Sequence, residues 1–181
     1  MDVKFEEILT FWFTEIEPRQ WWVQDPAFDE LVRSRFRLRL QQAAAGELSA
    51  WRSAPKGRLA EVIVLDQFSR NIHRGTPAAF AQDAQALALS QEAVASGALQ
   101  ALGEMERTFL LMPYMHSESR LVHVEAEVLF KQFAPKANHE FELRHKAIVD
   151  RFGRYPHRNQ ILGRESSAEE VEFLKQPGSA F

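Results

Sequence analysis

Three segments of the sequence place Arg, His and carboxylate side chains where a plain helical core would have none. In the first, LDQFSRNIHR at positions 65–74, Asp66 lies four residues before Arg70, so both lie on one face of a helix. A carboxylate in such an apolar stretch must be paired when it is buried, and Arg70 is the obvious partner. Asn71 and Arg74 follow in the same segment. The segment is either a structural ion pair between helices or part of a ligand site.

The second segment, ERTFLLMPYMHSE at positions 106–118, ends with His116 and Glu118. An imidazole and a carboxylate at such a connection are suited to acid–base chemistry. Two such residues do not make a metal site and the spacing H-E-x-x-H is absent, so we expect no metal ion. A hydrogen-bonded structural histidine is the alternative. Further along, His123 and Glu127 share an i+4 stripe, which predicts a solvated helix face.

The third segment, RFGRYPHRNQILGR at positions 151–164, contains four arginines and no acid. It therefore carries a formal charge of +4, which leaves −7 for the rest of a chain whose total is −3. Its candidate ligand-binding side chains are Arg154, His157, Arg158, Asn159 and Arg164. Arginine forks in a loop suit a phosphate or a carboxylate. Alternatively, the arginines end helices and pair with carboxylates in a structural network.

Taken together, the three segments predict a net-cationic pocket for a small anionic ligand, with or without acid–base chemistry. The candidate catalytic residues are His116, Glu118 and His157. The candidate ligand-binding residues are Asp66, Arg70, Asn71, Arg74, Arg154, Arg158, Asn159 and Arg164. In this hypothesis the arginines clamp the anion, one histidine is the general acid or base, and a carboxylate orients its imidazole. No cofactor is indicated, and whether the protein is an enzyme stays open.

A second hypothesis is an interaction module, in which a helical array holds a peptide in a groove. Trp21, Trp22 and Trp51 would be its anchors, because aromatic side chains dominate binding hot spots. Core packing is the simpler explanation for these residues, because tryptophan is usually well buried. A closed pocket with converging Arg and His would favour the first hypothesis, and a long exposed groove the second.

Composition excludes several classes of protein. The 181 residues predict one domain, and 22 basic against 25 acidic residues argue against a nucleic-acid partner. The absence of cysteine excludes thiolate nucleophiles, disulfides and Cys-ligated zinc. No apolar run approaches the roughly 18 residues of a membrane span, and the N-terminus lacks the basic start of a signal peptide. We therefore expect a soluble, cytoplasmic protein.

The elements that must position these residues are helices, because apolar residues recur at helical spacing and no segment shows strand and hairpin signals. Helices are expected over residues 5–13, 26–45, 58–71, 104–112, 119–133 and 138–152, with an Ala-rich helix ending at Gly97 and a short last helix capped by Ser166 and Glu169. Pro113 is expected to stop one of them. The predicted fold is all-α, a single domain of about eight or nine helices over 1–181 with a tail at 176–181.

At these segments the chain resembles the uncharacterised bacterial family called domain of unknown function 924. The matching stretches are ILTFWF, AAAGELSAW, LDQFSRNIHRGTPAAFAQD, ERTFLLMPYMHSE, RFGRYPHRNQILGR and PGSAF, which together span nearly the whole chain. The resemblance implies an all-helical, tetratricopeptide-like fold in a soluble protein. It implies no established reaction, cofactor or catalytic residue. His123 is a departure, because the family pattern favours Gln at that position.

Overall fold

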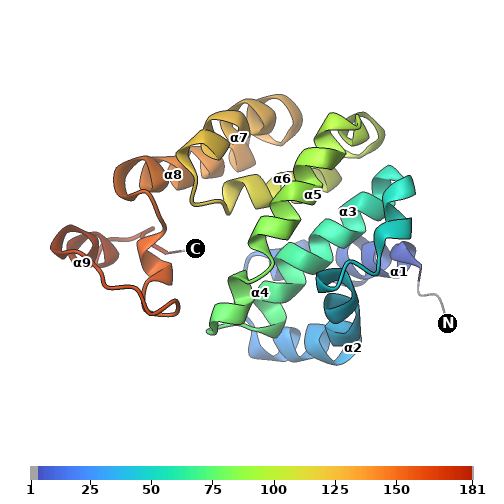
Figure 1. Cartoon of the computed structure of the whole chain (residues 1–181), viewed down its shortest axis with the longest axis horizontal. Helices are drawn as coiled ribbons and strands as arrows, with labels where there is room; N and C mark the ends of the chain where they lie inside the picture. Colours follow the sequence, from blue (N-terminus) through green and yellow to red (C-terminus); the bar gives the residue numbers. More distant parts are fainter. Residues whose placement is uncertain (1–3, 181) are drawn as a thin grey trace.

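The computed structural model describes residues 4–180, and within that range it is built of helices and contains no β-strand (Figure 1). The helices are α1 (Phe5–Thr10), α2 (Pro26–Ala44), α3 (Pro55–Ile63), α4 (Ser69–Ile72), α5 (Asp83–Ala95), α6 (Glu104–Met115), α7 (Arg120–Phe133), α8 (Lys136–Phe152) and α9 (Ala168–Leu174). The all-α prediction is therefore confirmed. Residue 181 of the tail lies outside the described residues. No helix in the described range is long and apolar enough to cross a membrane.

The start of α2 follows from its sequence. The Asp25 carboxylate accepts hydrogen bonds from the backbone N–H groups of Ala27 and Phe28, at 2.9 and 3.4 Å, and Pro26 occupies the first helical position. The helix ends just before Gly46, whose φ of 76° suits glycine. The predicted helix and its stripe of Phe28, Val32, Phe36 and Leu40, all of which are buried, are confirmed.

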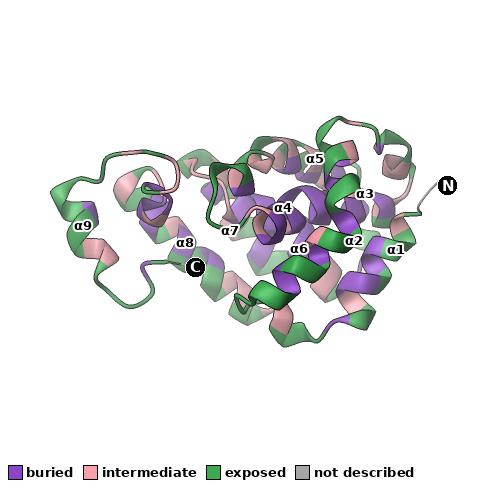
Figure 2. Cartoon of the chain, turned by 90° about the horizontal axis from the view of Figure 1, so that it is seen from below, coloured by how far each residue is buried: buried purple, intermediate pink, exposed green. Residues whose placement is uncertain are grey.

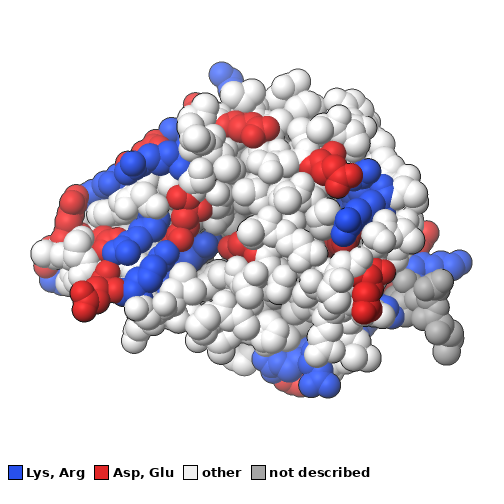
Figure 3. All heavy atoms as spheres, viewed as in Figure 1, with Lys and Arg blue, Asp and Glu red and all other residues white. Residues whose placement is uncertain are grey.

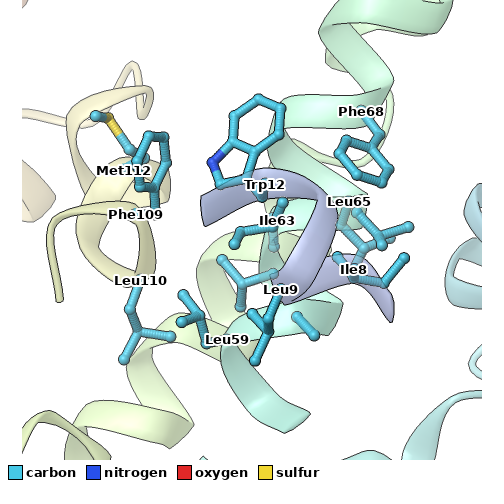
Figure 4. Packing of buried hydrophobic residues seen from close by; sticks show 14 of the residues in the cluster. Ile8, Leu9, Trp12, Leu59, Ile63, Leu65, Phe68, Phe109, Leu110 and Met112 are labelled. Atoms are coloured by element: carbon cyan, nitrogen blue, oxygen red, sulfur yellow. The ribbon is translucent and has the colours of Figure 1, made fainter. Parts of the chain in front are cut away.

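An aromatic core joins α2, α6 and the two π-helical turns that follow α1 and α3, Phe11–Glu15 and Val64–Phe68. The Phe36 ring lies 4.8 Å from the ring centroids of both Phe11 and Phe68. Trp12 lies between Phe68 and Phe109, at 5.6 and 5.5 Å, with aliphatic side chains beneath it (Figure 4). This core packs α3 against α6. The first polar segment follows α3 and the second ends just after α6, so the packing brings the two segments together.

The helix expected over residues 58–71 is interrupted in its middle. It begins earlier, at Pro55, and Val64–Phe68 forms a π-helical turn before α4 starts at Ser69. A π turn adds a residue to the helical repeat and commonly occurs at functional sites. Residues two apart point to opposite sides of a helix, so Phe68 packs in the aromatic core while Asp66 faces a polar cluster.

Three further predicted boundaries are wrong. The helix expected over 138–152 begins earlier, at Lys136. Pro113 does not stop a helix, because α6 continues through it to Met115. A proline inside a helix removes one backbone hydrogen bond, but Met112, Tyr114 and Met115 are all buried, and this packing holds the last turn in place. The capping box of α9 lies one residue later than predicted, with Ser167 and Glu170 in place of Ser166 and Glu169.

The C-terminal part of the chain has little apolar core of its own. Its buried apolar cluster is Ile148, Val149 and Tyr155, with Phe152 and Phe173 packed against it. Figures 1 and 2 place α9 at the opposite end of the molecule from α1, and most of its surface is exposed. Charged side chains of both signs gather over this end (Figure 3). Polar contacts must therefore hold much of this region together.

Candidate functional site

Asp66 is the centre of a buried polar cluster. Its Oδ1 lies 2.7 Å from Nδ1 of His116 and 3.1 Å from Nη1 of Arg70, and its Oδ2 accepts a 2.7 Å hydrogen bond from Gln67. Burial raises the pKa of Asp66, but the charge of Arg70 and the contacts with His116 and Gln67 outweigh it and hold the pKa far below its ordinary value. Asp66 is therefore a buried, ionised carboxylate.

Arg70 links this carboxylate to α5. Its guanidinium donates to both oxygens of Asp83, at 2.8 and 3.0 Å, as well as to Asp66. Oδ2 of Asp83 also lies 3.4 Å from Nη1 of Arg158, near the upper limit for a hydrogen bond. Asp83, at the start of α5, thus joins the first and third polar segments. The five residues Asp66, Arg70, Asp83, His116 and Arg158 are called the site network below.

Arg158 is held by aromatic rings as well as by hydrogen bonds. Its guanidinium carbon lies 4.6 Å from the ring centroid of Phe80 and 4.7 Å from that of Tyr155, within cation–π range. Its Nη2 donates to the carbonyl of His116 at 3.0 Å. The side chain is only 7% exposed, and its Nε has no hydrogen-bond partner among the described residues. A buried donor without a partner is uncommon in a folded protein.

The tautomer of His116 follows from its contact with Asp66. An ionised carboxylate can only accept, so Nδ1 carries the hydrogen and Nε2 has the lone pair. Nε2 makes no hydrogen bond to a described residue, and the ring, 16% exposed, lines a surface pocket. Burial and the charge of Arg70 lower the pKa of His116 below its ordinary value, despite the opposing effect of Asp66. At neutral pH the imidazole is therefore an uncharged acceptor directed by a carboxylate.

The pocket is an open depression of about 430 Å³ between the start of α5, the end of α6 and the segment after α8. Its polar lining residues are Asp83, His116, Ser117, Glu118 and Arg158. Its apolar lining residues are Pro77, Phe80, Ala81, Ala84, Leu87, Pro113 and Leu162. Residues of the second and third predicted segments line this pocket, whose volume is in the range of small-molecule sites. Asp66 and Arg70 of the first segment do not line it and contact it only through His116 and Asp83.

Glu118 forms part of the pocket rim and is fully paired. It accepts two hydrogen bonds from Arg164, at 2.7 and 2.9 Å, and one from the backbone N–H of Tyr155 at 2.7 Å. Burial raises the pKa of Glu118, but Arg164 and the Tyr155 N–H outweigh it and lower the pKa overall. Arg164 also donates to Asn159 at 3.0 Å. These contacts tie the third segment to the end of α6.

Other candidate residues lie in separate contacts. Asn71 and Arg74 both donate to Asp29 on α2, at 2.8 Å and, for Arg74, also at 2.5 Å. Arg154 donates to both oxygens of Glu170, at 2.7 and 2.8 Å. None of Asn71, Arg74 and Arg154 lines the pocket.

The last candidate residue, His157, is half-buried beside Tyr155 and does not line the pocket. Burial, with the neighbouring charge of Arg158, lowers the pKa of His157 to about 4. His157 is therefore uncharged at neutral pH.

The pocket differs from the predicted net-cationic site in its charge. Arg70 is paired with Asp66 and Asp83, and Arg164 with Glu118, so each cation beside the pocket is matched by a carboxylate. Arg158 shares Asp83 with Arg70 and has the weakest ionic contact of the three. The positive charge of the third segment is thus largely neutralised by acids from elsewhere in the chain, which spacing in the sequence does not reveal.

Three side chains hold the backbone on either side of His116. Tyr155 Oη donates to the carbonyl of Met115 at 2.5 Å, Arg158 to that of His116 at 3.0 Å, and His123 Nε2 to that of Ser117 at 2.8 Å. The last carbonyls of a helix lack helical partners, so such side-chain donors complete the end of α6. They also determine where the His116 ring lies.

The prediction that His123 belongs to a solvated face is wrong. His123 is fully buried, and its Nδ1 lies 2.7 Å from Oε1 of Glu142, which is also fully buried. Because Nε2 donates to Ser117, the pair must hold one proton between Nδ1 and the carboxylate. Burial raises the pKa of Glu142 above its ordinary value. The pair packs α7 against α8 next to the carbonyl of Ser117.

Four important residues were not among the candidates: Phe80, Asp83, His123 and Glu142. Asp83 is the last residue of the stretch LDQFSRNIHRGTPAAFAQD and lies one helical turn beyond Phe80. Its closeness in sequence to the first polar segment was the one feature that could have marked it as a candidate. Glu142 is the carboxylate on α8 that faces α7, and the sequence gives no sign of this pairing. Among residues 4–180, no group of three or more His, Asp or Glu side chains could hold a metal ion.

Comparison with known proteins gives two matches and one negative result. The family model described as "Bacterial protein of unknown function (DUF924)" matches residues 8–178. A solved structure of a protein of unknown function, ATU0120 from Agrobacterium tumefaciens, is similar to this chain with a TM-score of 0.90 and 36% identity. The match covers 94% of this chain and 96% of that one. No curated protein matches.

Proposed function

This chain belongs to the DUF924 family, and we propose that it binds a small ligand with an anionic group in the pocket between α5 and the end of α6, where His116 transfers a proton. The family description gives no activity, so the proposal is built on the site network alone. It selects, from the candidate residues, those that the pocket brings together: Arg158 for the anionic group, His116 for the proton, and Asp66 to orient His116.

The observation that carries the proposal is that two residues lining one pocket, Arg158 and His116, each have a side-chain nitrogen without a hydrogen-bond partner among residues 4–180. Arg158 Nε is a buried donor with no partner, and His116 Nε2 is an acceptor with none, within the described part of the chain. The carboxylates and guanidinium groups around them are paired with one another. A ligand that offers an anionic oxygen and an acidic proton would satisfy both atoms.

The chemistry that follows is general-base catalysis. His116 Nε2 accepts a proton from the ligand, and the imidazolium that forms is stabilised by the ionised Asp66 on its other side. Arg70 keeps Asp66 ionised, so the proton stays on the imidazole and does not pass to the carboxylate. The anionic group meanwhile stays on Arg158. Positioned bases of this kind typically contribute a factor of about 10² to 10⁴ in rate.

The alternative of a peptide-binding groove receives less support. Trp21 donates its indole N–H to the carbonyl of Trp12, and both Trp21 and Trp51 pack against the aromatic core. Of the three proposed anchors only Trp22 is largely exposed, at 54%, and its ring stacks on Phe109. The pocket at the site network is not lined by any of these tryptophans.

The test is binding of small anions to wild type and to two arginine variants. Acetate, lactate, phenyl phosphate and inorganic phosphate are screened by thermal shift, and each hit is quantified by calorimetry. Arg158→Gln removes the proposed anion contact, whereas Arg151→Gln removes an arginine of the same segment that is paired with Glu169 away from the pocket. At least one anion is expected to bind wild type and Arg151→Gln equally and Arg158→Gln at least tenfold more weakly.

Circular dichroism shows whether Arg158→Gln still folds, and Arg158→Lys provides a second variant that keeps the charge but loses the fork. Equal binding by all variants, or no binding by any anion in the panel, contradicts the proposal.

A further inference from the structure

We infer that the ligand of this pocket is a monoanion with an apolar body, of the type of a short aliphatic or aromatic carboxylic acid. The inference rests on the proposed function, because it assumes that the anionic group binds at Arg158. It adds two properties to that function: the ligand binds with one negative charge only, and it is apolar apart from the anionic group and the group whose proton His116 accepts. Simple alkyl carboxylates, which lack that second group, test these two properties without the proton transfer. Each property comes from a different part of the pocket lining.

The apolar property follows from the apolar residues that line the pocket beside the site network. Phe80, Ala84 and Leu87 line the pocket from the start of α5 and the turn before it, Pro113 from α6 and Leu162 from the segment after α8. Phe80 and Leu87 are only half-buried, so their side chains present apolar surface to the pocket. A ligand body that covers this surface removes it from water, which is favourable.

Phe80 connects the two parts of the pocket. Its ring lies 4.6 Å from the guanidinium carbon of Arg158 and 5.6 Å from that of Arg70. The anionic group on Arg158 therefore lies directly beside the start of the apolar wall. The ligand that fits this order has its charge at one end and its apolar part next to that charge, without a polar spacer.

The single charge follows from the pairing of the other groups. Asp83 and Glu118 both line the pocket, and their charges are compensated by Arg70 and Arg164, which leaves Arg158 as the cation with the weakest ionic partner. A second negative charge on the ligand would approach Asp83 or Glu118 with no cation left to neutralise it. A carboxylate therefore suits the pocket better than a doubly ionised phosphate.

The experiment is a calorimetric series with acetate, butyrate and hexanoate, using the full chain at pH 7.5. Binding is expected to tighten along the series, with an upper limit of about fourfold for each methylene that is fully buried. Adipate, which adds a second carboxylate to a chain of the same length, is expected to bind at least tenfold more weakly than hexanoate. Hexylammonium is expected not to bind. Leu87→Ser should weaken hexanoate and leave acetate nearly unchanged.

Leu121→Ser is the matched control for Leu87→Ser, because Leu121 is 84% exposed on α7 and does not line the pocket. Acetate or inorganic phosphate that binds through Arg158 as tightly as hexanoate would overturn the inference and leave the proposed function standing. Adipate that binds as well as hexanoate would overturn the single-charge part and leave the proposed function standing. Hexylammonium that binds as well as hexanoate would overturn the proposed function too, because a cation cannot use the contact with Arg158. If no member of the series and no phosphate binds, both the inference and the proposed function fail.

Discussion

The aromatic core and the site network each contain a residue of the same π turn, two positions apart in the chain. They are stabilised by different kinds of interaction. Phe68 and Asp66 belong to the same π turn, yet Phe68 packs among phenylalanine and tryptophan rings while Asp66 binds an arginine and a histidine. Apolar packing has no fixed partner, whereas each charge of the network needs a particular one. The stability of the core therefore depends on the volume of its side chains more than on which apolar residues they are. The stability of the network depends on which charged residues are paired more than on their volume.

The largest effect is expected in the core. Phe68→Ala removes a fully buried ring that contacts Phe36 and Trp12, so it leaves a cavity as well as losing burial. The free energy of unfolding should fall by about 3 to 5 kcal/mol. Urea denaturation measures this change, with the exposed Leu38→Ala as a control that should stay within about 0.5 kcal/mol. A loss below about 1 kcal/mol for Phe68→Ala would show that the core is loosely packed.

A somewhat smaller effect is expected at the same turn for Asp66→Ala. The change leaves His116 and Gln67 without their shared acceptor, while Arg70 keeps Asp83. Removing one member of a buried charge cluster costs roughly 3 kcal/mol when part of the pairing survives. Urea denaturation again measures it, and Glu172→Gln, in an exposed pair with Lys175, should change stability by less than about 0.5 kcal/mol.

Replacing both Asp66 and Arg70 measures how much the two residues stabilise each other. If Asp66→Ala costs no more than Glu172→Gln, the network adds nothing to stability. In a double-mutant cycle with Arg70→Ala, the two changes should be clearly non-additive, because they share one hydrogen-bonded pair.

The smallest expected change, expressed per pH unit, is the dependence of the free energy of unfolding on pH that the buried His145 and His157 produce. Burial lowers the pKa of His145 to about 3 and that of His157 to about 4, below the value of about 6.5 in an unfolded chain. Between these values the unfolded chain binds more protons than the folded one. The stabilisation is therefore complete above pH 6.5 and is lost as the pH falls toward 4, by up to about 1.4 kcal/mol per pH unit for each histidine.

Urea denaturation at pH 7.5, 6.5, 5.5 and 4.5 measures this slope. His157→Gln should reduce it, whereas Gln160→Ala, an exposed change in the same segment that removes no ionisable group, should not. A free energy of unfolding that is constant across this range would show that the buried histidines are not held in the uncharged form.

The difference between the two regions also explains what the sequence could predict. The stripe from Phe28 to Leu40 and the cap at Asp25 depend on neighbours within one helix, and both are confirmed. The Asp66–Arg70 pair has the same local origin and is present. The π turn at Val64–Phe68 and the passage of α6 through Pro113 depend instead on packing between helices, so local rules did not indicate them.

Long-range pairing limited the prediction of the site in the same way. The arginines of the third segment were visible in the sequence, but their partners lie far along the chain: Asp83 for Arg158 and Glu118 for Arg164. The sequence gives the number of charges and not which of them meet. For this reason His123 was assigned to the surface, although its partner Glu142 buries it.

The most direct test of the proposed site is nitrogen NMR of the His116 imidazole and of the arginine Nε–H groups during titration with hexanoate. Before addition, His116 should be uncharged at pH 7, with hydrogen on Nδ1 and none on Nε2, because Asp66 accepts from Nδ1. Hexanoate should then shift the signals of His116 Nε2 and Arg158 Nε. The signal of Arg154 Nε should stay in place, because that group is bonded to Glu170. A protonated His116, hydrogen on Nε2, or equal shifts of Arg154 and Arg158 would contradict the account.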